Sequence, residues 1–204
     1  MSQHTTKGGC IVQKKEMTQI MIGDSYQAVT LLRFLPTEIV RIKTKEKDGY
    51  DALQVWVGKK NLSKTKGIKT VYTYMTEFKL HADVVNTFES GLVLTPSVLE
   101  GIDTVTLVAV SKGKGFQGGI KRFGLKGMPA THGHKFTRHL GSKGNRKPRR
   151  TQKWHPHAWH MWLEQVTLRD RKIVDTTEID GTQYLVIKWS VPGNYNSYLR
   201  LELQ

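Results

Sequence analysis

Residues 103–119 read Asp-Thr-Val-Thr-Leu-Val-Ala-Val-Ser-Lys-Gly-Lys-Gly-Phe-Gln-Gly-Gly, and the character of the chain changes in the middle of this stretch. The residues up to Val110 are mainly β-branched or apolar, which predicts a strand over 103–110. Glycine and lysine replace them from Lys112 onward, and a basic, Gly-rich segment continues to Trp162. We therefore divide the chain into a strand-forming body, residues 1–111 and 163–204, and an inserted segment, residues 112–162.

The inserted segment holds most of the excess positive charge. It contains thirteen Lys or Arg, six His, nine Gly and no Asp or Glu, whereas the whole 204-residue chain has a formal net charge of +15. The remaining residues carry nineteen cations and seventeen carboxylates, so their charges nearly cancel. Positive charge confined to one Gly-rich segment is typical of a surface that binds a polyanion. The sequence thus predicts a segment that binds RNA or DNA, inserted into an ordinary domain.

Strand patterns occur on both sides of the insertion. Side-chain types alternate with a period of two between Ile39 and Thr44, and Asp180-Gly181 is a tight hairpin signal. Regularly spaced strands from both ends of the chain predict a mainly β fold, a closed or partly closed barrel. The predicted strands are residues 26–34, 39–44, 52–57 and 103–110 before the insertion, and 164–168, 172–175, 183–189 and 198–203 after it.

Other segments are expected to be short connections. Residues 59–69 are polar and basic, which favours a loop or short helix with solvated charge over a nucleic-acid contact. Residues 86–100 are the best place for a short helix, and Pro96 limits it. Val191-Pro-Gly193 separates the last two strands.

Composition also predicts the compartment. The single cysteine, Cys10, excludes an internal disulfide framework and suits a reducing environment. The sequence has no apolar run of about 18 residues, the length that a membrane span requires. The first ten residues lack the apolar region of a signal peptide. We expect a soluble, cytoplasmic protein with no membrane partner, with an organelle interior as the alternative.

Gly113-Lys-Gly-Phe-Gln-Gly118 follows a strand and matches the G-x-G-x-x-G pattern of dinucleotide-binding folds. That interpretation also requires a following helix, which Gly119, Gly124 and Pro129 oppose, and an acidic residue roughly twenty positions later, which is missing. We expect instead that the absent β-carbons let the main chain approach phosphates and sugars closely. No cofactor and no small-molecule substrate are expected.

Cations and aromatic residues are interleaved in the insertion. Arg146-Lys-Pro-Arg-Arg150 places four cations within five residues, and guanidinium groups can pair with phosphates or stack on unpaired bases. Exposed aromatic rings in such a segment are candidates for base stacking. For Trp159 and Trp162, packing against the body is an equally good interpretation. The aromatic residues in question are Phe116, Phe123, Phe136, Trp154, Trp159 and Trp162.

Six histidines raise the possibility of a metal centre, at His132-x-His134 and His155-x-His157-x-x-His160 in particular. Their neighbours are cations, Cys10 is distant in sequence, and a hard-metal nuclease would need carboxylates that this segment lacks. We therefore expect no metal. A histidine-metal nuclease or RNA-processing enzyme and a DNA-compacting protein remain as the alternatives.

Several motifs together resemble a known family. The chain closely resembles the third large-subunit ribosomal protein family in its bacterial form, over nearly its whole length from about Gln13. The motifs that carry this resemblance are Ser111-Lys-Gly-Lys-Gly-Phe-Gln-Gly118, Ile120-Lys-Arg-Phe-Gly124, Gly127-Met-Pro-Ala-Thr-His-Gly133, Leu140-Gly-Ser-Lys-Gly144, Lys14-Lys-Glu-Met-Thr-Gln19, Glu46-Lys-Asp-Gly-Tyr-Asp-Ala-Leu-Gln54 and Val191-Pro-Gly193.

The resemblance implies a six-stranded β-barrel of the translation-protein type, seated on large-subunit ribosomal RNA and contacting neighbouring large-subunit proteins. It also implies that the insertion extends through this RNA toward the peptidyl-transferase centre, and that the protein supports ribosome assembly without being an enzyme. By the same resemblance, Asn145 falls at the position of the extension's tip, where some relatives carry a methylated Gln. Residues 151–162 depart from the Lys-, Gly- and Met-rich arm that is usual in relatives.

Charge, aromatic content and matched motif positions together define the expected RNA-binding residues. Gly133 and Gly144 also occupy matched positions. The expected side-chain contacts are Lys112, Lys114, Phe116, Lys121, Arg122, Lys126, His132, His134, Lys135, Arg138, His139, Lys143, Asn145, Arg146, Lys147, Arg149, Arg150, Lys153, Trp154 and His155.

Overall fold

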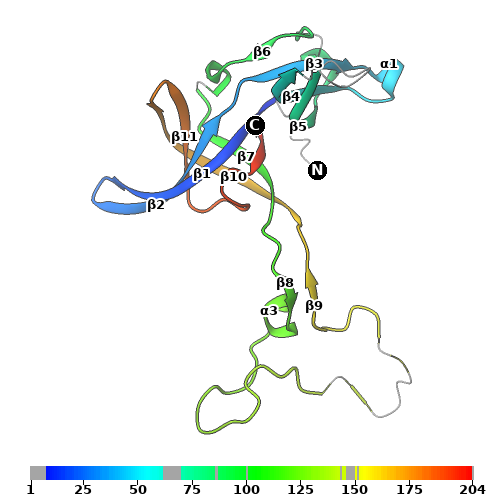
Figure 1. Cartoon of the computed structure of the whole chain (residues 1–204), viewed down its shortest axis with the longest axis vertical. Helices are drawn as coiled ribbons and strands as arrows, with labels where there is room; N and C mark the ends of the chain where they lie inside the picture. The colour runs from blue at the N-terminus through cyan, green and yellow to red at the C-terminus, as the bar shows by residue number, and fades with distance from the viewer. Residues whose placement is uncertain are drawn as a thin grey trace. The chain divides into compact units, whose positions relative to one another are not determined.

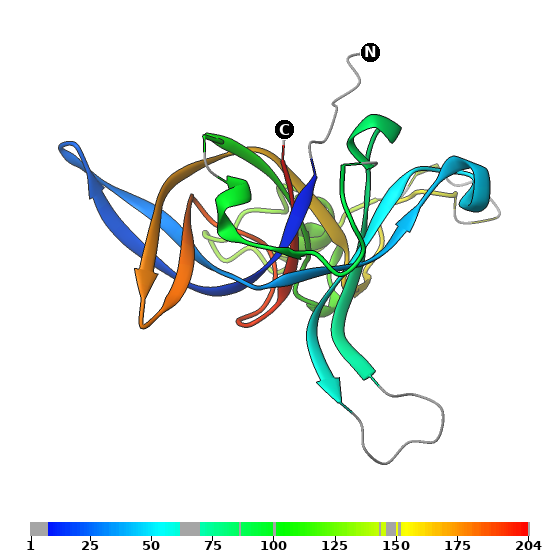
Figure 2. The same cartoon turned by 90° about the horizontal axis from the view of Figure 1, so that it is seen from above.

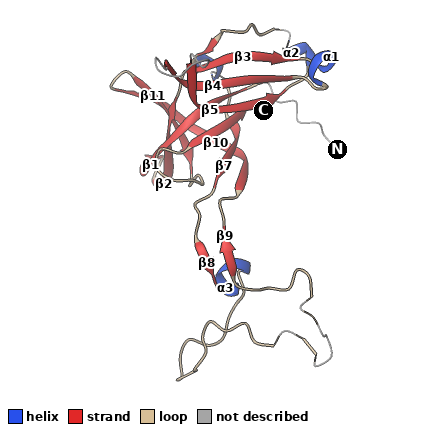
Figure 3. Cartoon of the chain, turned by 45° about the vertical axis from the view of Figure 1, so that its right-hand side comes forward, coloured by secondary structure: helices blue, strands red, loops and turns tan. Residues whose placement is uncertain are grey.

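The computed structural model describes residues 8–61, 70–85, 87–99, 101–142, 144–145, 150 and 152–203. The chain divides into two compact units, and Figure 1 labels strands and helices of both. Unit 1 comprises residues 1–111 and 165–204, and unit 2 comprises residues 112–164. Strands dominate unit 1, whereas most of the described part of unit 2 is loop (Figure 3).

Six antiparallel strands of unit 1 close into a barrel, in the order β1-β12-β7-β10-β11-β2 (Figure 2). Strands from both sides of unit 2 form this barrel, three from each side, so the mainly β class and the six-stranded barrel are confirmed. The barrel strands are β1 (Gly9–Ile22), β2 (Ser25–Phe34), β7 (Thr104–Val110), β10 (Gln165–Ile179), β11 (Thr182–Lys188) and β12 (Tyr198–Leu203).

A separate four-stranded antiparallel sheet, in the order β5-β4-β3-β6, completes unit 1. Residues 39–44 and 52–57 were expected in the barrel, and this expectation was wrong. The chain leaves the barrel at Leu35-Pro36, because proline has no N–H to continue the ladder of β2. The strand β5 was not predicted, and residues 62–69 of the expected basic connection lie outside the described residues. The sheet strands are β3 (Thr37–Lys43), β4 (Ala52–Asn61), β5 (Thr70–Lys79) and β6 (Val93–Leu94).

The strand β1 connects the two cores of unit 1. Successive side chains of a strand point to opposite faces. Cys10 and Val12 accordingly pack inside the barrel with Leu199 and Leu201, whereas Ile11 packs into the second core with residues such as Phe78. Because both faces of the strand are buried, apolar and polar residues do not alternate at the start of β1.

Three short helical turns belong to unit 1: α1 (Lys45–Asp48), α2 (Ala82–Val85) and the 3-10 helix η1 (Pro96–Leu99). The helix predicted within 86–100 is thus a single 3-10 turn, and Pro96 begins it instead of limiting it. Proline is tolerated there because the first N–H groups of a helix have no partner within the helix. Within the described ranges, no helix is long and apolar enough to cross a membrane.

Residues 164–168 and 172–175 were predicted as two strands, but β10 is continuous from Gln165 to Ile179. Its register shifts between Leu168 and Arg171, which indicates a β-bulge. Asp170 has φ 53° at this point. The predicted hairpin turn at Asp180-Gly181 is confirmed, with φ 50° and 69°. Two positive φ values are what a two-residue type I′ turn requires.

Candidate nucleic-acid interface

Two short strands pair the outgoing and returning arms of unit 2. Gly115–Gln117 (β8) and Trp159–Met161 (β9) are antiparallel, with Phe116 directly opposite His160. The main-chain N–H of Lys114 donates to the carbonyl of Met161 at 3.0 Å and extends this ladder. This part of the inserted segment is therefore a regular antiparallel ribbon.

A short helix, α3 (Gly119–Phe123), follows the Gly-rich pattern directly. The prediction that glycines would oppose a helix here was wrong, although the helix is only five residues long. The N–H of Arg122 donates to the carbonyl of Gly118 at 3.0 Å. The helix ends at Gly124, whose φ of 65° is the left-handed conformation that glycine adopts most readily. No acidic residue follows at the spacing that a ribose would require, so the dinucleotide interpretation still fails.

A few close apolar contacts hold the chain after α3. A β-carbon on Gly119 would lie 2.6 Å from Cδ2 of Leu140, so this helix position accepts Leu140 because it has no side chain. The N–H of Met128 donates to the carbonyl of Thr137 at 3.1 Å. Gly127 lies beside the same carbonyl. These contacts tie residues 119–140 together and leave the charged side chains on the outside.

Arg122 is the expected RNA-binding cation with the most internal contacts. Its Nη1 donates to the backbone carbonyl of His157 at 3.0 Å, which joins α3 to the returning arm. Its guanidinium carbon lies 4.9 Å from the ring centroid of Phe123. Arg122 therefore holds the arms of unit 2 in place, and RNA contact by the same side chain remains a prediction.

Most of the other predicted side chains are exposed. No carboxylate occurs between Lys112 and Trp162, so these cations cannot form ion pairs within the segment. His155 is half-buried, with its ring 5.7 Å from that of His157. Lys143, Arg146, Lys147 and Arg149 lie outside the described residues. The exposed predicted residues are Lys112, Lys114, Phe116, Lys121, Lys126, His132, His134, Lys135, Arg138, His139, Asn145, Arg150, Lys153 and Trp154.

The aromatic side chains of the arms are largely uncovered. Trp154 is 97% exposed, Trp159 57% and Trp162 64%. Both rings are thus more than half exposed, and base stacking by Trp159 and Trp162 remains a prediction. Phe116 contacts the edge of His160, and His160 stacks on Trp162. Trp162 was a candidate for base stacking, whereas His160 was not among the expected RNA contacts. The two-residue spacing of His160 and Trp162 is the strand spacing that puts both side chains on one face.

Comparisons with known proteins agree with these features. The profile of the family described as ribosomal protein L3 matches residues 81–191. A protein of Lawsonia intracellularis, large ribosomal subunit protein uL3, is 36% identical and covers 97% of this chain and 99% of its own length. The proteins of the same name from Oceanobacillus iheyensis and Borrelia hermsii are 33% and 35% identical, over 95% and 94% of this chain.

The chain belongs to the ribosomal protein L3 family. Its resemblance to that family is therefore confirmed over almost the whole length.

The histidines of this L3-family chain do not gather into a metal site within the described part of the structure, where no group of three or more His, Cys, Asp or Glu side chains could hold an ion. His132 and His134 are exposed on a turn, and His132 has φ 58°. His155 and His157 are half-buried, and His160 lies in β9.

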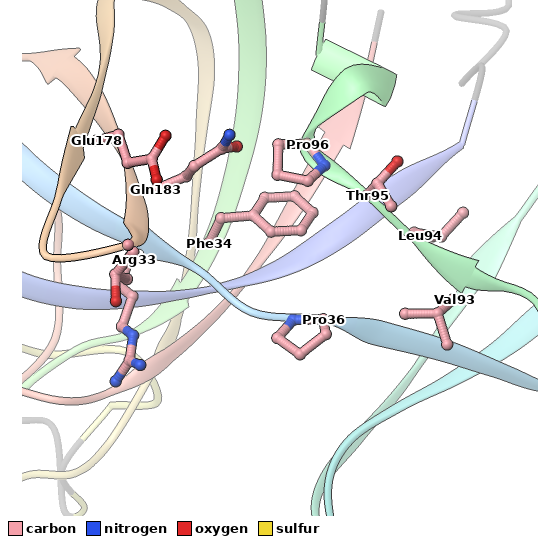
Figure 4. Close-up of a pocket in the computed structure, with 11 residues that line it drawn as sticks. Arg33, Phe34, Pro36, Val93, Leu94, Thr95, Pro96, Glu178 and Gln183 are labelled. Atoms are coloured by element: carbon pink, nitrogen blue, oxygen red, sulfur yellow. The ribbon is translucent and has the colours of Figure 1, made fainter.

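Unit 1 of the L3-family chain contains a hollow of about 350 Å³ between the β10–β11 hairpin, β2 and the β6–η1 segment (Figure 4). Phe34, Pro36 and Pro96 line it, with Arg33 and Glu178 among its polar residues. Its described lining contains one carboxylate and neither imidazole nor thiol. The hollow lies outside the segment 112–162.

Proposed function

We propose that unit 2 binds ribosomal RNA through its exposed cations and its Gly-rich main chain. As a member of the ribosomal protein L3 family, the chain is a structural constituent of the large ribosomal subunit, and it is not an enzyme. The family decides against the two alternatives, a histidine-metal nuclease and a DNA-compacting protein. The partners are large-subunit RNA and the neighbouring proteins of that subunit.

One observation carries the RNA-binding proposal: the segment has thirteen Lys or Arg residues and no carboxylate, and eight of the nine cations that the structure describes there are exposed. These charges cannot be neutralised within the segment, and burying them unpaired against protein would cost their hydration free energy. RNA phosphates neutralise them, and the release of condensed counterions drives the association. Neutralisation also lets RNA helices pack closely around the arms, which supports subunit assembly and the shape of the peptidyl-transferase centre.

The main chain of unit 2 supports a close approach to RNA. Its described glycines contribute little bulk, and several have positive φ, which turns the chain sharply without a β-carbon in the way. Main-chain N–H groups can then reach phosphate oxygens directly. The glycines with positive φ are Gly115, Gly124, Gly127, Gly133, Gly141 and Gly144.

The test measures the affinity of the full-length protein for a large-subunit RNA fragment as a function of salt. Replacing the exposed Lys114, Lys121 and Lys126 with Gln removes three cations from unit 2. Each phosphate contact contributes roughly 0.7 to 0.9 to the slope of log affinity against log salt, so the slope should fall by about 2 to 3.

The control replaces three exposed lysines of unit 1, Lys45, Lys47 and Lys172, with Gln. Both variants lose the same net charge, so a difference between them reports the location of the contacts. We expect the control to keep most of the original salt slope. Equal slopes for the two triple variants would refute unit 2 as the principal electrostatic contact.

A further inference from the structure

The ribbon formed by β8 and β9 has one chemically distinct face. Phe116 and His160 are cross-strand partners, and Trp162 follows His160 by two residues, so the three rings share a face. The exposed Lys114 lies two residues before Phe116 on the same arm, and its N–H donates to the Met161 carbonyl at 3.0 Å. The face formed by Phe116, His160 and Trp162 therefore carries three aromatic rings, and we refer to it as the aromatic ladder.

The rings of the aromatic ladder are in mutual contact. His160 and Trp162 stack, with centroids 4.8 Å apart and planes inclined by 22°. Phe116 meets His160 edge to face, with centroids 5.5 Å apart and an interplanar angle of 85°. Such contacts favour fixed ring orientations. The side chains are thus arranged before any partner binds.

The ends of the aromatic ladder are open to solvent. Phe116 is 60% exposed and Trp162 is 64% exposed, although each ring already makes one aromatic contact. Rings so exposed can contact a flat partner without any rearrangement of the chain. An exposed row of aromatic residues on strands is an arrangement that RNA-binding domains use to stack unpaired bases.

The positive charge around the aromatic ladder favours a nucleotide over a protein surface as its partner. The ladder lies in the segment with no carboxylate, and the exposed Lys114 adjoins it, two residues before Phe116. An apolar protein surface would cover Lys114 without neutralising it, whereas a nucleotide offers a base to the rings and a phosphate to the ammonium group. We propose that the aromatic ladder is a stacking site for unpaired nucleotides of RNA, with Lys114 bound to a neighbouring phosphate. This inference rests on the proposed RNA binding by unit 2.

The experiment compares two probes of the same length and charge: an unstructured oligouridine and an oligomer with abasic positions at its centre. In the full-length protein, Phe116→Leu with Trp162→Leu keeps apolar side chains but removes both π faces. We expect the affinity for oligouridine to fall about 5- to 30-fold, since base stacking contributes strongly to binding of single strands. The affinity for the abasic oligomer should stay within about 2-fold, because phosphate contacts are unchanged.

Two matched variants guard against a general structural effect. Tyr26→Leu removes an aromatic side chain of unit 1 that is 71% exposed and lies outside segment 112–162, and it should leave both affinities unchanged. Phe116→Tyr with Trp162→Phe keeps aromatic faces at both positions and should retain most of the preference for oligouridine. Near-wild-type circular dichroism is expected for every variant.

The outcomes separate this inference from the proposed function. Salt-dependent binding that does not distinguish the two probes would overturn the stacking site and leave electrostatic RNA binding intact. A loss of affinity for both probes in the leucine variant would also overturn it, as would crosslinking of Trp162 in the assembled subunit to a protein instead of RNA. Absence of salt-dependent binding to either probe would overturn both proposals.

Discussion

Gly9 is the position where the two cores of unit 1 leave least room. It begins β1 and pairs with Glu202 of β12. A β-carbon at Gly9 would lie 2.3 Å from the backbone oxygen of Leu201 and 2.4 Å from Cε1 of the buried Phe78. Optimal separations between non-bonded carbon atoms are about 3.5 to 4.0 Å, so a shift of roughly 1 Å is required.

Gly9→Ala should therefore destabilise unit 1 strongly. Overpacking a well-packed core costs about 1 to 3 kcal/mol. We expect about 3 kcal/mol, because one obstacle is backbone in the barrel ladder and the other is a buried ring. With a denaturant slope of about 2 to 3 kcal/mol per molar urea, the unfolding midpoint should fall by about 1 to 1.5 M.

The assay is urea unfolding followed by far-ultraviolet circular dichroism, with Gly113→Ala as the control. A β-carbon at Gly113 would lie 3.6 Å from Cδ2 of Leu163, an ordinary contact. Both substitutions reduce the freedom of the unfolded chain equally, so the difference between them reports the steric overlap. A urea midpoint of Gly9→Ala within about 0.3 M of the wild-type value would refute the steric overlap inferred at Gly9.

Three further substitutions test contacts in unit 1. The hydrogen bond from Lys43 lowers the pKa of Glu77 in the folded protein. The folded state is therefore stabilised by this bond above the ordinary glutamate pKa, and it loses that stabilisation as pH falls through the lowered pKa. The difference in urea midpoint between wild type and Glu77→Gln should accordingly be larger at pH 7 than at pH 3. Thr30→Val removes the bond from a buried hydroxyl to the Trp189 carbonyl at 2.7 Å and should cost about 1 to 3 kcal/mol in chemical denaturation. Gly181→Ala places a β-carbon at φ 69° and should cost about 1 to 2 kcal/mol, with faster amide exchange in the β10–β11 hairpin.

Local sequence patterns were sufficient to predict much of the candidate nucleic-acid interface. Absence of carboxylates and abundance of cations depend on composition alone, so the exposed basic surface of unit 2 followed directly from residues 112–162. The aromatic ladder did not follow, because Phe116 and His160 come from arms separated by more than forty residues. Their contact depends on the register of β8 with β9, which no local pattern specifies.

The strands, the barrel drawn from both ends of the chain and the Asp180-Gly181 turn were determined by periodicity and turn chemistry, which act over a few residues. Only the tertiary structure decided that β3 and β4 leave the barrel, and that β1 buries Ile11 on one side and Cys10 on the other. A period of two identifies a strand and its faces. Which neighbour covers each face is decided by packing between residues far apart in sequence.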